Sequence, residues 1–389
     1  MMKSYLSSTV RQLKPSGIRR FFDLAAGMEG VISLGVGEPD FVTSWAVREA
    51  SILSLEKGYT SYTANAGLLT LREEIQKYMK RKFQLSYDAH NQIIVTVGAS
   101  QALDIAFRAV IDEGDEVIIV EPSFVSYAPL VTLAGGTPIA VQTTQENGFK
   151  LTAEQLEAAI TPRTKAILLC SPNNPTGSLL EKEELEALTA IILKHDLLVL
   201  SDEIYAELTY DGSFTSIASL PDMKDRTIVI SGFSKGFAMT GWRLGYVCGH
   251  PDLIEAMLKV HQYAMMCAPA MAQYGAVEAL QNGEQDVVDM RKSYRRRRNY
   301  MVQSLNEMGL DCHVPGGAFY VFPSIRKTGM SSEEFAEQLL LKERVAVVPG
   351  NVFGESGEGY VRCSYASSME SLQEAVRRIA NFMHQMQHA

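Results

Sequence analysis

The sequence lacks paired cysteines, an excess of basic residues and long apolar runs. Its five cysteines are scattered along the chain without a C-x-x-C pair, so the pattern predicts neither a metal site nor a disulfide framework. The formal net charge of −9 at pH 7 argues against a nucleic-acid binder, which needs a basic face for phosphates. No apolar run approaches the roughly 18–20 residues of a membrane span, and residues 1–17 show no signal peptide. We expect a cytoplasmic protein without a metal, a nucleic-acid partner or a membrane partner.

One basic run stands out against this acidic composition. Residues 295–298 are four consecutive arginines in a helix-like stretch, beside Tyr294 and Tyr300. Such a run is typical of a solvated face or an ion-pair cluster, and it can also form an anion site. The composition favours the first interpretation.

The middle of the chain alternates short apolar strands with amphipathic helices. The expected strands lie in five segments rich in Val, Ile and Leu, at 91–100, 115–124, 164–175, 197–205 and 226–235. Continuous apolar strands separated by helices predict an α/β fold, in which a mainly parallel sheet carries helices on both faces.

The C-terminal part follows a different pattern. A charged helix is expected over 284–309 and a closing helix over 369–387, with short strands between them within 317–324, 345–350 and 359–365. This mixture is typical of a separate α+β unit.

The length of the chain also favours two units. Single cores stop growing near roughly 250–300 residues, and this chain has 389. We predict a large α/β domain over 47–285, a small α+β domain over 286–389, and an N-terminal arm over 1–46 that packs onto the small domain.

Polar and aromatic residues follow the predicted strands. Ligands of parallel sheets gather beyond the carboxyl ends of the strands, and the residues at those ends are Gly98, Ala99, Ser100, Pro122, Ser123, Phe124, Asn173, Asn174, Pro175, Asp202, Glu203, Tyr205, Ser231, Ser234 and Lys235. The pattern predicts a binding site at this edge of the sheet.

Lys235 and Asp202 carry the strongest chemical signal in this set. Lys235 follows an apolar strand, so burial can lower the pKa of its amine and make it the nucleophile that Schiff-base chemistry requires. Asp202 ends another strand, where an unpaired carboxylate is costly to bury, so it should face a cation such as a protonated pyridine nitrogen. The alternatives are a solvated lysine and an aspartate that caps a following helix.

Two turns add weaker signals. VTVGASQAL at 95–103 places small residues at a strand-to-helix turn, where free amides favour a phosphate, although plain tight turns look similar. SPNNPTG at 171–177 contains Asn174–Pro175, which is compatible with a cis peptide and with an amide that faces a ligand. An ordinary Pro/Gly turn is the alternative.

Five motifs in one order resemble those of a known enzyme family. They are GEPD at 37–40, NNPTG at 173–177, SDEIY at 201–205, SK at 234–235 and GWRLGY at 241–246. Over essentially its whole length the chain resembles the pyridoxal-phosphate-dependent aminotransferases of fold type I, class I and II. The resemblance implies pyridoxal 5'-phosphate as cofactor. It also implies the transfer of an amino group from an L-amino acid to a 2-oxo acid by a ping-pong mechanism, with 2-oxoglutarate as the expected acceptor.

The resemblance implies catalytic roles for Lys235, Asp202 and Tyr205. Lys235 would form the Schiff base and then move the proton between the substrate Cα and C4′ of the cofactor. Asp202 would keep the pyridine nitrogen protonated, so that the ring acts as an electron sink. Tyr205 would hydrogen-bond the phenolic oxygen O3′, together with Asn174.

The resemblance also implies how the cofactor is held. Arg243 would pair with the phosphate, which donors at Ala99, Ser100 and Ser234 would share. Phe124 would stack on the face of the ring, where a flat apolar partner suits a π-system.

Substrate binding and assembly follow from the same resemblance. Arg362, in GYVRCSY, would bind the substrate α-carboxylate with its bidentate fork, helped by Gly37 and Asn174. Tyr62 would reach the phosphate of the neighbouring subunit, so the expected active unit is a homodimer.

The chain departs from the family pattern at two places. Many members carry a phosphate-binding Ser or Thr three residues before the lysine, where this chain has Gly232, so the role is moved to Ser234. Aspartate-specific members use a basic residue of the partner subunit in a segment that corresponds to 261–273, and this segment contains no Arg or Lys. Its methionines and alanines suit an apolar pocket, whereas Arg19 could restore an acidic preference.

Two other functions share the scaffold. A C–S β-lyase uses the same fold and cofactor, because fold does not determine the reaction. A regulator that binds pyridoxal phosphate as a sensor would carry an N-terminal DNA-binding domain, for which the position of SLGVGEPD from residue 33 leaves no room in this sequence. The aminotransferase is the favoured interpretation.

Overall fold

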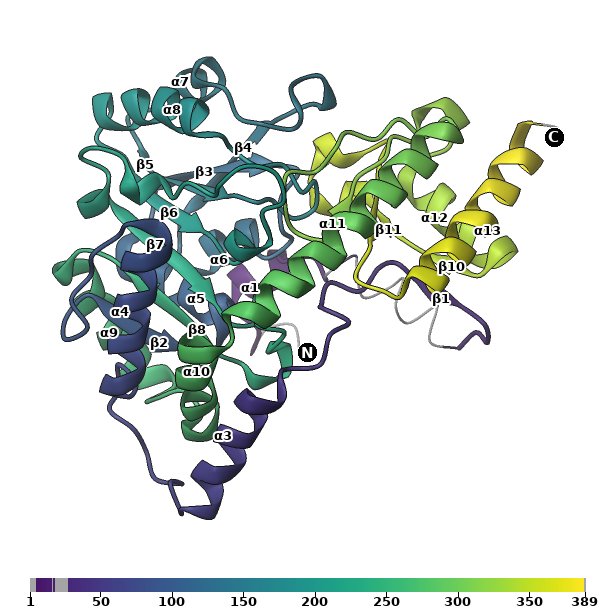
Figure 1. Ribbon diagram of the computed structural model, residues 1–389. Helices are drawn as coiled ribbons and strands as arrows, with labels where there is room; N and C mark the ends of the chain where they lie inside the picture. Colours follow the sequence, from purple (N-terminus) through teal and green to yellow (C-terminus); the bar gives the residue numbers. More distant parts are fainter. Residues whose placement is uncertain (1–4, 16, 18–26, 388–389) are drawn as a thin grey trace.

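A seven-stranded sheet forms the larger half of the molecule in the computed structural model, which describes residues 5–15, 17 and 27–387 (Figure 1). In spatial order its strands are β2 (Ile93–Thr96), β8 (Gly245–Cys248), β7 (Thr227–Gly232), β6 (Leu198–Asp202), β5 (Thr164–Cys170), β3 (Glu116–Glu121) and β4 (Thr137–Gln142). β8 runs antiparallel to both neighbours, and the other adjacent pairs are parallel. The expected mainly parallel sheet is confirmed.

Helices cover both faces of this sheet. One face carries α5 (Gly98–Val110), α6 (Tyr127–Leu133) and α9 (Pro251–Ala264). The other carries α4 (Leu69–Phe83), α7 (Ala153–Ala159), α8 (Lys182–Lys194) and α10 (Ala270–Asn282), with α3 (Trp45–Glu56) packed on α10. Within β3, Ile119 packs toward α5 and α9 whereas Ile118 packs toward α7 and α8. Both faces are buried, which explains the continuous apolar strands.

The smaller half is built around two short sheets. β9 (Tyr320–Val321), β11 (Val348–Pro349) and β12 (Val361–Ser364) form an antiparallel sheet in the order β11-β12-β9, and β1 (Ile32–Ser33) pairs in parallel with β10 (Val345–Ala346). Its helices are α11 (Glu284–Glu307), α12 (Ser332–Glu343) and α13 (Met369–Gln387). In Figure 1, α11 extends from the larger half into the smaller one. β1 of the N-terminal segment pairs here, whereas α1 (Ser8–Gln12) of the same segment contacts α6 of the larger half.

The five predicted strands are confirmed, and two further strands were missed. β4 lies at the edge of the sheet, contains Pro138 and has mostly exposed or half-buried residues, so it lacks a continuous apolar run. β8 has four residues and begins at Gly245, inside a glycine-containing motif. A short helix, α1 (Ser8–Gln12), precedes β1. The domain boundaries after residues 46 and 285 stay a prediction.

The described part of the chain contains no helix that is both long and apolar enough to cross a membrane. The longest helix, α11, is strongly charged along its length. Arg19 lies outside the described residues.

Candidate active site

A cavity of about 270 Å³ lies at the carboxyl ends of the parallel strands, between the two halves of the molecule. Of the predicted site residues, it is lined by Gly37, Ala99, Ser100, Phe124, Asn174, Asp202, Tyr205, Ser234, Lys235, Arg243 and Arg362. Tyr62 does not line it, and its side chain is largely exposed. Residues from distant parts of the sequence therefore meet in one cavity.

Lys235 reaches into this cavity from the loop that follows β7. Its Nζ donates a hydrogen bond of 2.6 Å to the carbonyl oxygen of Gly37. Burial, with the positive charge of Arg362 as the second cause, lowers the pKa of Lys235 from 10.5 to about 8. The amine is thus more readily deprotonated near neutral pH than a solvated lysine, as a nucleophile requires.

Asp202 ends β6 and is buried in the floor of the cavity. The hydroxyl of Tyr127 donates to its Oδ2 at 2.7 Å, and the backbone N–H of Ile204 donates to its Oδ1 at 3.2 Å. Burial raises the pKa of Asp202, and these two hydrogen bonds oppose the rise. No α-helix follows, because residues 206–208 form a single 3₁₀ turn. A buried carboxylate held in this way suits a cationic partner in the cavity.

The N-terminus of α5 and Arg243 form one corner of the cavity. The first amides of a helix have no partner within the helix, so those of Ala99 and Ser100 are available to an anion. Gly98 has a φ of +75°, and a Cβ there would lie 2.7 Å from Nη2 of Arg243. The left-handed backbone and the neighbouring guanidinium therefore both favour glycine at this position. This corner is shaped for a phosphate.

Arg362 lies on β12 at the opposite side of the cavity and is buried. Its Nη1 donates to Oδ1 of Asn174 at 2.9 Å, and its Nη2 donates to the carbonyl oxygen of Gly35 at 2.8 Å. The guanidinium also lies over the rings of Tyr320 and Phe353, at 4.5 and 5.0 Å from their centroids. These contacts hold a planar cation in one orientation, which suits a carboxylate.

Two tyrosines of the cavity were missed by the sequence analysis. Tyr127 holds Asp202, and the hydroxyl of Tyr320 lies 2.9 Å from that of Tyr205. Tyr127 lies three residues after Phe124, at the start of α6. It would have been predicted if the set of candidate residues after β3 had been extended to the start of this helix. Tyr320 lies in a two-residue strand of the smaller half, where no local pattern signals a site.

The structure also explains the residue types at positions 174 and 232. The Asn174–Pro175 peptide is cis, as the sequence allowed. At Gly232 a Cβ would lie 2.9 Å from Cα of Gly245 on the adjacent strand, so a serine or threonine would force β7 and β8 apart. Ser234, to which the phosphate role was moved, is buried and lines the cavity.

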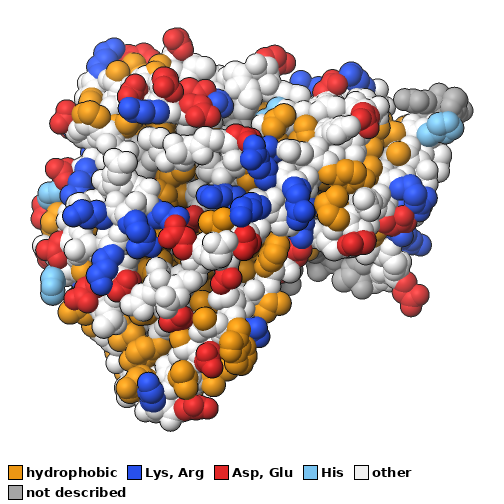
Figure 2. Space-filling model, viewed as in Figure 1, with side chains coloured by type: hydrophobic (Ala, Val, Ile, Leu, Met, Phe, Trp, Pro, Cys, Tyr) orange, Lys and Arg blue, Asp and Glu red, His pale blue; other side chains and the backbone are white. Residues whose placement is uncertain are grey.

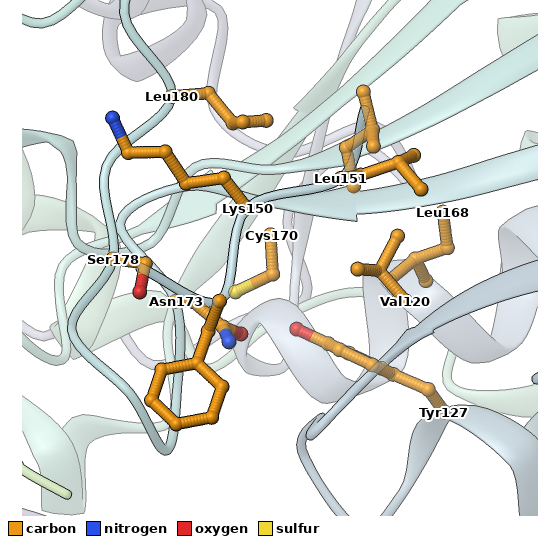
Figure 3. Close-up of a pocket in the computed structure, with 11 residues that line it drawn as sticks. Val120, Tyr127, Lys150, Leu151, Leu168, Cys170, Asn173, Ser178 and Leu180 are labelled. Atoms are coloured by element: carbon orange, nitrogen blue, oxygen red, sulfur yellow. The ribbon is translucent and has the colours of Figure 1, made fainter. Parts of the chain in front are cut away.

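A second, much smaller cavity shares Tyr127 with the first (Figure 3). Its volume of about 30 Å³ is close to that of one water molecule in the liquid. In Figure 3 the hydroxyl of Tyr127 points toward Cys170 and Asn173, whereas the amine of Lys150 points away from them. Lys150 is paired with Glu184 at 2.9 Å. This cavity is too small for a substrate.

Glu203, next to Asp202, is buried and does not line the main cavity. Ser201 and Ser216 donate hydrogen bonds to its Oε1 at 2.9 and 2.5 Å. Burial raises the pKa of Glu203 from 4.5 to about 7, against these hydrogen bonds. The folded state therefore binds an additional proton between about pH 4.5 and 7.

We expect Glu203 to make the protein less stable as the pH rises. Its contribution is fully present below about pH 4.5 and is lost as the pH rises through about 7. The Glu203→Gln variant keeps the size of the side chain without its charge. Between pH 5 and 8 its free energy of unfolding should fall by about 3 kcal/mol less than that of wild type. Denaturant unfolding of both cofactor-free proteins across this pH range measures the difference. Parallel pH curves would contradict the assignment.

The lining residues as a set fit pyridoxal phosphate. Arg243 and the end of α5 match a phosphate, the buried carboxylate of Asp202 matches a protonated ring nitrogen, and Phe124 offers a flat apolar face. Lys235 supplies an amine with a lowered pKa. The chemistry of this donor set agrees with the cofactor that the motifs implied.

Comparison with known proteins agrees with this geometry. The family described as aminotransferase class I and II matches residues 29–379. The Bacillus subtilis (strain 168) protein YugH, an aminotransferase by name, is 69% identical over 383 residues, 98% of this chain and 99% of its own. Aspartate aminotransferase of Pyrococcus abyssi is 47% identical over 377 residues, 96% of this chain and 97% of its own.

A solved structure shows the same arrangement of the chain. The aromatic aminotransferase of Pyrococcus horikoshii OT3 is 44% identical, with a TM-score of 0.91 over 96% of this chain and all of its own. At this level of identity and coverage, both family and fold are shared. The chain therefore belongs to the class I and II aminotransferases, and it is an enzyme of fold type I that depends on pyridoxal phosphate.

Proposed function

We propose that this aminotransferase moves the amino group of an L-amino acid to 2-oxoglutarate by a ping-pong mechanism. The observation that carries the proposal is the meeting of Lys235 and Arg362 in one cavity. One side chain offers an amine with a pKa of about 8, and the other offers an oriented, buried guanidinium. An amine beside a carboxylate-binding group suits an amino acid, in which the amino group and the carboxylate are attached to the same carbon.

The proposed roles of the cofactor-binding residues follow from their positions. Bound pyridoxal phosphate supplies an electron sink that stabilises negative charge at the substrate Cα. Lys235 would hold the cofactor covalently through Nζ, and Asp202, held by Tyr127, would keep a proton on the ring nitrogen. Phe124 would lie against the ring.

The remaining contacts to the cofactor would fix its two ends. Ala99, Ser100, Ser234 and Arg243 would bind the phosphate at the end of α5. Tyr205 and Asn174 would donate to the phenolic oxygen. Tyr205 is paired with Tyr320, and burial raises the pKa of both hydroxyls, so each keeps its proton at neutral pH.

Two residues would act on the substrate. The Nζ of Lys235, once free, would take the proton from the substrate Cα and return it at the adjacent carbon of the cofactor, a general acid–base role that suits a pKa of about 8. Arg362 would bind the α-carboxylate with its fork, with Asn174 and Gly37 beside it. The two groups together would orient the Cα–H bond toward Lys235.

The half-reactions test this function directly. Single L-amino acids are added to the purified holoenzyme, followed by 2-oxoglutarate, while the visible absorbance is recorded. We expect one donor to convert the cofactor to its amine form and 2-oxoglutarate to reverse the change. The amino acids to be tested should include aspartate and the aromatic amino acids, because both occur in the names of relatives. Release of pyruvate and ammonia from a cysteine conjugate without an oxo acid would instead establish a C–S lyase.

The proposed active unit is a homodimer. Exposed apolar side chains lie on α3 and in the segment that follows it, among them Trp45, Ile52, Leu53, Leu55, Tyr59 and Tyr62. Figure 2 shows such side chains around the lower tip of the molecule, where α3 lies in Figure 1. Large apolar patches mark interaction sites. Tyr62 is 82% exposed, so it is free to reach the phosphate site of a second subunit.

A subunit-mixing experiment tests this role of Tyr62. Tyr62→Ala and Lys235→Ala homodimers are mixed after reversible dissociation and assayed at a cofactor concentration that saturates only wild type. A site built from the Lys235 of one subunit and the Tyr62 of the other is intact in the hybrid. Random mixing should therefore restore about a quarter of wild-type activity. No recovery would place Tyr62 in its own subunit's site, whereas full activity of the Tyr62→Ala homodimer before mixing would place Tyr62 outside the site.

A further inference from the structure

The run of four arginines is not used by the proposed reaction, and the structure shows that its members have different surroundings. Arg295 pairs with Asp211 on the surface. Arg297 and Arg298 are buried on α11, and each forms an ion pair with an aspartate far away in the sequence. The run is thus an ion-pair cluster within the chain, in agreement with the favoured interpretation.

The partner of Arg297 belongs to the segment that covers the cavity. Residues 35–43, here called the strap, run between the two halves and beneath α11 toward α3 (Figure 1). Two carbonyl oxygens of the strap accept hydrogen bonds from the cavity: Gly35 from Arg362 at 2.8 Å, and Gly37 from Lys235 at 2.6 Å. The position of the strap therefore sets the surroundings of both groups.

The strap is attached to the larger half by two side chains. Glu38 accepts a hydrogen bond of 2.9 Å from Thr240, and Thr43 donates to the carbonyl of Ala238 at 2.6 Å. Both partners lie in the loop that also carries Lys235 and Arg243. These contacts fix one side of the strap only.

Asp40 attaches the other side of the strap to α11. Nη1 of Arg297 lies 2.8 and 2.9 Å from the two oxygens of Asp40, and the hydroxyl of Tyr294 donates to Oδ1 at 3.1 Å. The guanidinium of Arg297 lies 5.3 Å from the ring centroids of both Phe41 and Tyr294. Arg297 is buried, whereas the side chain of Asp40 is 27% exposed. Such a partly buried ion pair contributes little net stability, and its best-supported use is to specify one arrangement.

We propose that Arg297 and Asp40 are a positioning pair for the active site. By holding the strap against α11, they place the carbonyls of Gly35 and Gly37, and through them the guanidinium of Arg362 and the amine of Lys235. Neither residue of the pair lines the cavity. The inference rests on the proposed role of Arg362 in binding the carboxylate.

The chain offers a matched control for the test. Arg298 is also buried on α11, pairs with Asp211 at 2.6 Å, donates to the carbonyl of Pro315 and lies over the ring of Tyr210. These partners all lie outside the strap, so Arg298→Met removes a comparable buried guanidinium without releasing Asp40. Arg297→Met and Asp40→Asn remove the two members of the pair.

The first readout is hydrogen–deuterium exchange of peptides covering residues 34–43 in the cofactor-free proteins. We expect Arg297→Met and Asp40→Asn to speed exchange by about tenfold, and Arg298→Met to leave it at the wild-type rate. The second readout is the Kd of maleate and of 3-phenylpropionate for the holoenzymes, followed by the cofactor absorbance. Here we expect a rise of about tenfold for the two pair variants, and a change within about twofold for Arg298→Met.

Each outcome decides the proposal. It is supported if both readouts change for Arg297→Met and Asp40→Asn alone. It is overturned if Arg298→Met changes them equally, because the effect is then general destabilisation, or if exchange rises while Kd stays constant. If Arg297→Met does not fold, Asp40→Asn decides. The Kd of the same two carboxylates for Arg362→Lys shows separately whether Arg362 binds carboxylates. If this Kd were unchanged, the proposed role of Arg362 would be wrong, but the exchange rates would still show whether the pair holds the strap.

Discussion

Replacement of Lys235 by alanine is expected to abolish transamination while leaving the protein folded. The variant loses the covalent attachment of the cofactor and the group proposed to move the Cα proton. Acid–base catalysis alone accounts for factors of 10²–10⁴, so we expect kcat to fall by about 10⁴-fold or more. Stopped-flow absorbance with the best donor measures the loss.

The fold should survive this change for a physical reason. Burial lowers the pKa of Lys235, which means that the folded state disfavours its charged form. Removing the buried amine relieves that penalty, so the melting temperature of the cofactor-free protein should not fall. The cofactor should still bind through Arg243 and Asp202, but borohydride should not link it covalently to the variant, as it links it to Lys235 of wild type. Small primary amines should restore part of the turnover, since they can replace the missing base. Normal turnover of Lys235→Ala would refute the assignment.

Replacement of Arg362 by methionine is expected to raise KM for every amino acid. The α-carboxylate is common to all of them, whereas the side chain is not. Truncating one member of a buried, hydrogen-bonded charge pair costs about 2–5 kcal/mol, so we expect kcat/KM to fall by about 10²–10³-fold. Arg362→Lys should recover little, because an ammonium lacks the planar fork that Asn174 and Gly35 now orient.

Arg326 provides the control for this experiment. Its guanidinium also lies over a tyrosine ring, 4.8 Å from the centroid of Tyr360, but it does not line the cavity. Arg326→Met should keep the wild-type KM. If Arg362→Met also kept it, the carboxylate would bind elsewhere in the cavity.

Much of the larger half follows from local patterns. Each of the five predicted strands is apolar on both faces, because helices cover both sides of the sheet. Residues directly after such strands meet at one edge, so Lys235, Asp202 and Asn174 could be placed together before the fold was known. β4 was missed because most of its residues are exposed or half-buried at the edge of the sheet, and β8 was missed because it begins at Gly245, inside the GWRLGY motif.

The sequence alone determined which chemical groups the site contains. Each of its motifs is a short, contiguous segment at the end of a strand, so its residue types are visible without the fold. Local order does not say what those groups touch. Tyr127 holds Asp202 across 75 residues, Arg362 donates to Gly35 across 327, and Arg297 meets Asp40 across 257. The first contact depends on how α6 packs on the sheet, and the other two depend on how the smaller half and the N-terminal segment pack against it. Their geometry, and the lowered pKa of Lys235 that burial in the same cavity produces, come from that packing.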